Sequence, residues 1–86
     1  MALPAVPDWL KLRDGELKPG IRDHILFVVL GGTPQYRLEV RPAKGKETCQ
    51  ITQTNNGKRL DGGQEYPDRA AALAGGLAEL RERLGW

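Results

Sequence analysis

The chain has 86 residues, of which 40% are hydrophobic and 28% charged, and its formal net charge is +2. This length predicts one small domain that spans residues 1–86. The single cysteine excludes an intramolecular disulfide, and the longest apolar run, residues 25–30, is too short to cross a bilayer. Residues 1–7 lack the features of a secretion signal. We therefore expect a cytoplasmic protein without a membrane partner.

The basic side chains are concentrated in the middle of the chain. Residues 1–34 hold four basic and four acidic side chains, and residues 60–86 hold three and five. Residues 35–59 hold six basic and two acidic side chains. All of the excess positive charge therefore falls in one stretch of 25 residues. Such a stretch favours an anionic partner.

Residues 1–22 are predicted to form an extended or hairpin segment. The dipeptide Asp14-Gly15 is typical of a type I′ turn, which would pair Leu12 with Leu17. Residues 23–32 predict a strand that is apolar on both faces. The C-terminal helix can cover one face, and we expect the N-terminal segment to cover the other. A partner molecule is the alternative cover for that second face.

Two further strands are predicted at residues 35–41 and 47–54. Alternation directs Tyr36, Leu38 and Val40 inward, and Pro42 is expected to end the first strand. The dipeptide Asn56-Gly57 predicts a two-residue turn that pairs Thr54 with Arg59. The side chains predicted to face water are Arg37, Glu39, Arg41, Thr48, Gln50, Thr52, Thr54, Arg59 and Asp61.

A helix is predicted over residues 67–85, where leucines recur at helical spacing. Gly75 and Gly76 fall inside it, and a close approach of the helix to the sheet would explain them. Gly85 suits the left-handed position after the last turn, and Trp86 is expected to fold back onto that turn. The fold class is therefore α+β: an antiparallel sheet of three or four strands over residues 23–66, with one helix on its inner face.

The sequence offers no catalytic constellation, and we do not expect an enzyme. It contains no serine, and its only histidine and cysteine, His24 and Cys49, fall on strands that a simple meander keeps apart. Cys49 is expected to be a small buried hydrophobe. Metal-ligand spacing is absent. We predict no cofactor, no metal and no small-molecule substrate.

The water-facing side of the sheet, called the outer face below, is competent to bind duplex DNA. Its threonines and glutamine offer hydrogen bonds, and its arginines carry forked donors suited to phosphate or guanine. Lys44, Lys46 and Lys58 are predicted at the hairpin ends, where they can meet phosphates. An ordinary solvated sheet also shows polar residues outward, and that interpretation stays open.

Residues 36–85 resemble the sheet-plus-helix DNA-binding domains of plant ethylene-response factors and the arm-binding domains of tyrosine integrases. The resemblance is carried by Tyr36-Arg37, Arg41, Gly45-Lys46, Ile51, Gly57-Lys58-Arg59, Gly63, Tyr66 and the alanines of 70–74. It implies that the outer face enters the major groove. The implied contact residues are Arg37, Arg41, Lys46 and Arg59, with Thr52 as a further candidate. Where those families carry tryptophans, this chain has Glu47, Leu60 and Asp61.

Two hypotheses follow. In the first, the chain is a duplex-DNA-binding module whose site comprises Arg37, Arg41, Lys46, Thr52, Lys58 and Arg59. In the second, it is a protein-interaction or oligomerisation module, with a protein partner or a second copy bound at the apolar strand 25–30 and at the sheet edges.

Overall fold

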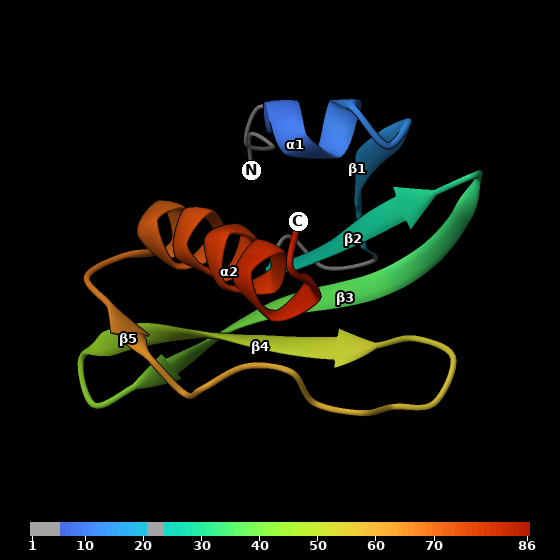
Figure 1. Cartoon of the computed structure of the whole chain (residues 1–86). Helices are drawn as coiled ribbons and strands as arrows, with labels where there is room; N and C mark the ends of the chain where they lie inside the picture. The colour runs from blue at the N-terminus through green and yellow to red at the C-terminus, as the bar shows by residue number, and fades with distance from the viewer. Residues whose placement is uncertain (1–5, 21–23) are drawn as a thin grey trace.

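The fold is known from a computed structural model, which describes residues 6–20 and 24–86. The start of the predicted strand at Asp23, and residues 1–5 and 21–22 of the predicted N-terminal segment, lie outside the described residues. The elements are α1 (Asp8–Lys11), β1 (Gly15–Pro19), β2 (Ile25–Leu30), β3 (Thr33–Ala43), β4 (Lys46–Gln53), β5 (Glu65–Tyr66) and α2 (Arg69–Leu84). The strands form one antiparallel sheet in the order β1-β2-β3-β4-β5, with α2 packed against it (Figure 1). The predicted α+β class and C-terminal helix are confirmed.

Two tight turns set the register of the central strands. Gly31-Gly32 joins β2 to β3 and Lys44-Gly45 joins β3 to β4, and all four residues have positive φ, as a type I′ turn requires. The predicted end of the strand at Pro42 is wrong, because β3 continues to Ala43. The Val40 N–H donates to the His24 carbonyl. The nitrogen of Pro42, two residues further on, points to the same side of β3 as the Val40 N–H. Because β2 begins at Ile25, which pairs with Glu39, no residue of β2 lies opposite Pro42, and the missing N–H of proline costs no hydrogen bond between β2 and β3.

The connection after β4 is longer than the sequence predicts. Thr52, and not Thr54, is the partner of Arg59, and the Gln53 N–H donates to the Lys58 carbonyl. Only Gly57 of the predicted Asn56-Gly57 turn has positive φ. The Asn56 side chain accepts a hydrogen bond from the Lys58 N–H at 2.9 Å and so stabilises a four-residue loop. The register moves by two residues, which leaves every side chain on its predicted face.

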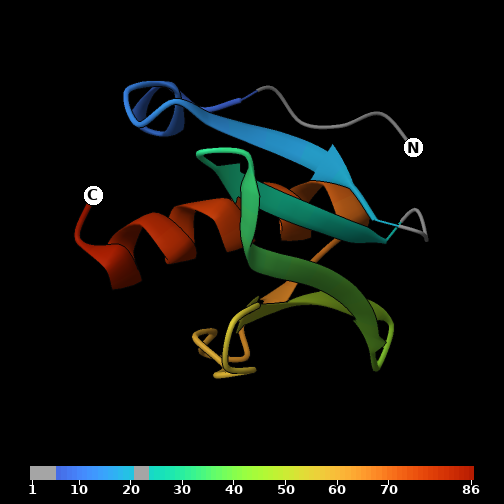
Figure 2. The ribbon, with the colours of Figure 1, turned by 90° about the vertical axis from the view of Figure 1, so that its right-hand side faces the viewer.

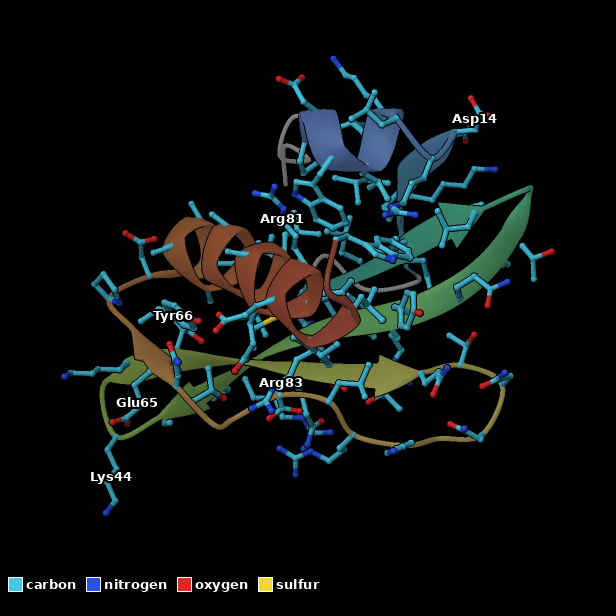
Figure 3. The ribbon with its side chains drawn as sticks, viewed as in Figure 1. Asp14, Lys44, Glu65, Tyr66, Arg81 and Arg83 are labelled. Carbon is cyan, nitrogen blue, oxygen red and sulfur yellow. The ribbon has the colours of Figure 1, made fainter. Side chains whose placement is uncertain are left out.

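The hydrophobic core lies between α2 and the inner face of the sheet. Its members are Leu10, Leu17, Leu26, Val28, Tyr36, Leu38, Val40, Cys49, Ile51, Ala72, Leu73, Leu77 and Leu80. A Cβ on Gly76 would overlap Cys49, and one on Gly75 would overlap the ring of Tyr66, which lies between β5 and α2 (Figure 3). The predicted close approach at these two glycines is confirmed.

Both ends of α2 are closed, and the C-terminal end is closed at Gly85 as the sequence predicts. The Asp68 carboxylate accepts a hydrogen bond from the Ala71 N–H at 2.8 Å, which caps the first turn. Gly85 has φ 72°, and the Trp86 N–H donates to the Arg81 carbonyl at 3.0 Å. Trp86 packs beside Trp9, with ring centroids 5.9 Å apart. These contacts join the end of α2 to α1.

The N-terminal segment does not form the predicted hairpin. Residues 8–11 are the helix α1, Leu12 is 87% exposed, and β1 pairs with β2 through Leu17 and Val28. The long apolar strand offers β1 a partner, and burial of Leu10 against β1 secures α1. The described part of the segment, residues 6–20, also does not cover the second face of β2, since Leu10 joins the same core as α2 and both helices lie on one side of the sheet (Figure 2).

Candidate functional site

The outer face is the side of the sheet opposite α2, and no described element covers it. Tyr36, Leu38 and Val40 point into the core, so the alternate residues of β3 point away from it. The strand register places Thr52 of β4 beside Arg37 of β3, and Arg59 beside Thr52. The strand phase on which the predicted site depends is therefore correct.

Five of the six predicted site residues share this face. Arg37, Thr52 and Arg59 form one row across neighbouring strands. Arg41 pairs with Thr48 two rows further along, beyond the Glu39–Gln50 pair, and Lys46 pairs with Ala43 beside the β3–β4 turn. Lys58 is exposed next to Arg59, but alternation directs it to the other side. Lys44 extends away from the fold at the tip of the turn (Figure 3).

Glu39 organises two of the arginines. Its Oε1 lies 3.0 Å from Arg37 Nη2 and 3.4 Å from Arg41 Nη2, and its Oε2 lies 3.5 Å from His24 Nε2. The Glu39 side chain is only 13% exposed, whereas those of Arg37 and Arg41 are 40% and 56% exposed. The carboxylate is thus covered while the guanidinium groups remain accessible. The sequence placed Glu39 on this face without indicating that role.

Asp61 plays a similar part at the sheet edge. It accepts a hydrogen bond from Arg59 Nη2 at 2.7 Å and one from the Ile51 N–H at 3.0 Å. Its side chain is 2% exposed and that of Arg59 is 59% exposed. Burial acts to raise the pKa of Asp61, but these hydrogen bonds outweigh it and the pKa lies below its ordinary value. Asp61 therefore stays ionised and holds Arg59.

One half of the outer face is apolar, as expected from a strand that is apolar on both faces. Phe27 lies directly beside Arg37, and Ile25 lies beside Glu39; both are half-buried. Lys18 of β1 extends the row on the far side of Phe27. Sequence reasoning missed Lys18 because its partner was assigned within a hairpin and not to β2.

The histidine and the cysteine have different surroundings and different side-chain partners. His24 contacts Glu39 on the outer face, whereas Cys49 is 3% exposed in the core. Burial, with the Asp61 and Glu79 carboxylates, raises the pKa of the Cys49 thiol to about 12. A thiol with this pKa is protonated at neutral pH and is a poor nucleophile. These two residues therefore do not form a catalytic pair.

Comparisons with protein-family models, curated proteins and solved structures found no match to this chain. Within residues 6–20 and 24–86, no helix has the length and apolar character needed to cross a membrane. The same described part of the chain contains no cluster of three or more His, Cys, Asp or Glu side chains that could hold a metal ion.

Proposed function

We propose that this chain is a duplex-DNA-binding module that places its outer face in the major groove. The observation that carries the proposal is the row Arg37–Thr52–Arg59 on the side of the sheet that no described element covers. This row spans two strand spacings, about 10 Å. The major groove of B-DNA is about 12 Å wide and admits strands.

Charge and side-chain chemistry support the same proposal. Arg41 and Lys46 lie on the β3–β4 turn side of the row, and Gln50 and Thr48 of β4 supply hydrogen-bonding groups between the row and Lys46. A duplex is favoured over a single strand because stacking on single-stranded bases needs exposed aromatic rings. Phe27 is the only aromatic residue that register puts on the described outer face, and it is half-buried.

The proposal is tested by titrating the isotope-labelled protein with a short mixed-sequence duplex and following the backbone amide signals. We expect the signals of β3 and β4 to move while the exposed side of α2 stays unchanged. If about four phosphates are neutralised, affinity should fall on the order of 100-fold between about 50 and 200 mM salt.

A charge reversal at the row provides the matched comparison. Arg37→Glu should abolish duplex binding at the higher of the two salt concentrations. The amide spectrum should still be that of a folded protein, since Arg37 lies outside the core. Lys11→Glu makes the same charge change on the exposed side of α1 and should bind like the wild type. A protein that forms no complex with any duplex at low salt is not a DNA-binding module.

A second candidate function rests on Ile25 and Phe27. These apolar side chains are half-buried on the uncovered face beside the edge strand β1. A second copy or a protein partner that packs there would bury them further. If this candidate is correct, substitution of Phe27 should weaken association with a second copy or a protein partner. If the DNA proposal is correct, substitution of Arg37 should weaken association with the duplex.

A further inference from the structure

The outer face pairs covered carboxylates with exposed arginines. Glu39 and Asp61 side chains are 13% and 2% exposed, while the arginines that they contact are between 40% and 59% exposed. A ligand that approaches this face therefore meets guanidinium groups first. The carboxylates act from underneath and fix where those groups lie.

Glu39 also brings two arginines together. The Cα atoms of residues 37 and 41 on one strand are about 13 Å apart. Both Nη2 atoms nevertheless lie within hydrogen-bonding distance of the same oxygen, at 3.0 and 3.4 Å. Those two nitrogens are therefore no further apart than the sum of these distances. Without the carboxylate, two guanidinium groups at such a separation would repel each other.

The covered carboxylate changes which ligand the arginines suit. A phosphate oxygen near Arg37 and Arg41 would also feel the negative charge of Glu39. A neutral acceptor pair, such as N7 and O6 of guanine, carries only partial negative charges and is repelled less by that carboxylate. Each guanidinium has five N–H donors, so donors remain after the contact with Glu39. This environment favours base edges over the DNA backbone.

The lysines at the β3–β4 turn are in the opposite situation. Among the described residues, neither Lys44 nor Lys46 lies within ion-pair distance of a carboxylate. Both are exposed, and Lys44 extends beyond the end of the sheet (Figure 3). Their full charge is available for phosphate groups.

We propose that Glu39 is a positioning residue that holds Arg37 and Arg41 as a guanine-reading pair, while Lys44 and Lys46 contact phosphates. This inference rests on the proposed binding of duplex DNA and adds the base class and the division of tasks. It predicts a preference for guanine that depends on N7, an acceptor that only the major groove exposes.

The test compares two duplexes of one sequence, in which the second carries 7-deazaguanine at every guanine and so lacks N7. Wild-type protein should bind the ordinary duplex on the order of 10-fold more tightly. In E39Q the ratio of the affinities for the two duplexes should be close to one. E39Q should bind the modified duplex at least as tightly as wild type does, since a negative charge is lost. A merely structural defect would weaken both complexes alike.

Two further variants complete the test. Replacing Lys44 and Lys46 with glutamine should lower the salt slope by about two and leave the ratio unchanged. Arg37→Lys retains the charge but not the fork, so it should lower the ratio and keep the salt slope. Arg37→Lys also serves if E39Q does not fold.

The outcomes separate the two proposals. If no duplex is bound, the proposed function itself fails. If both duplexes are bound equally by the wild type, DNA binding stands and the guanine-reading pair is wrong. If E39Q retains the wild-type ratio, Glu39 does not position the arginines for guanine. If Arg37→Lys retains it, Arg37 does not read guanine and the guanine-reading pair is wrong.

Discussion

The Asp61 carboxylate joins the segment after β4 to the edge of that strand. Folding lowers the pKa of Asp61 below its ordinary value of 3.8, because hydrogen bonds from Arg59 and the Ile51 N–H outweigh the effect of burial. The folded state therefore binds this proton less readily than the unfolded chain does. The stabilisation is complete above the ordinary pKa and is lost as the pH falls through the lower folded-state value.

This linkage gives a prediction for acid stability. As the pH is lowered from about 5 to about 2, the free energy of unfolding should fall more steeply for the wild type than for Asp61→Asn. Urea unfolding at several pH values measures the difference. Glu65→Gln removes an exposed carboxylate that has no ion pair within the described residues, and it should follow the wild type. Parallel curves for wild type and Asp61→Asn would contradict the assigned role.

At the scale of elements, Gly75 and Gly76 allow α2 to pack closely against the sheet. A methyl group on Gly76 would overlap Cys49 and lie 3.2 Å from a methyl carbon of Leu38. Alanine is favoured over glycine in a helix by about 1 kcal/mol. Here the overlap should dominate, and we expect Gly76→Ala to destabilise the protein by about 1–3 kcal/mol in urea unfolding.

Two companion variants isolate the cause of that loss. Ala74→Gly, on the exposed side of α2, should cost only about 1 kcal/mol through helix propensity. Cys49→Ala removes the sulfur and should restore part of the stability of Gly76→Ala in a double-mutant cycle. An increase in stability for Gly76→Ala alone would mean that the helix does not need this close approach.

The elements also show which local signals are reliable. Two consecutive residues with positive φ form each of the turns at Gly31-Gly32 and Lys44-Gly45. Asn56-Gly57 and Asp14-Gly15 carry equally strong turn signals, yet neither forms a two-residue turn. At Asp14-Gly15 the competing interaction is the pairing of β1 with β2, which a local pattern does not contain. Turn chemistry therefore predicts a hairpin only where no better strand partner exists.

At the scale of the whole molecule, the sheet has one face that packs against α2 and one that no described element covers. Val28 is fully buried on the inner face, whereas Phe27 is half-buried on the outer face. Val28→Asp should abolish cooperative unfolding, because an unpaired charge enters the core. Phe27→Ser should lower the unfolding midpoint and keep the transition cooperative. Thermal unfolding followed by circular dichroism measures both.

The same pair of variants bears on the protein-interaction candidate. Leu26 and Val28 are both 0% exposed, so a charge at either position would report on folding and not on an interface. Sedimentation of the wild type and Phe27→Ser is the informative comparison. If an oligomer forms and Phe27→Ser leaves it intact, the apolar part of the outer face is not its interface.

Most of the predicted site could be located from the sequence because strand alternation is a local property. Arg37, Arg41 and Thr52 are in phase once the hydrophobic positions of β3 and β4 are known, and a register shift of two residues does not alter that. The contacts of Glu39 with Arg37 and Arg41, and those of Asp61 with Arg59 and the Ile51 N–H, could not be predicted. Their roles depend on rotamers and on which backbone groups lie unpaired at the sheet edge.

The order of hydrophobic and polar residues by itself determined the α+β class, the central strands, the leucine-lined helix, and the two faces of the sheet. These depend on periodicities of two and 3.6 residues, which are written along the chain. Only the tertiary structure decided that β1 joins the sheet, that α1 lies on the same side of the sheet as α2, and that none of residues 6–20 and 24–86 forms an element over the outer face. Those features depend on competition between distant partners for the same apolar strand, and sequence-local patterns do not rank such partners.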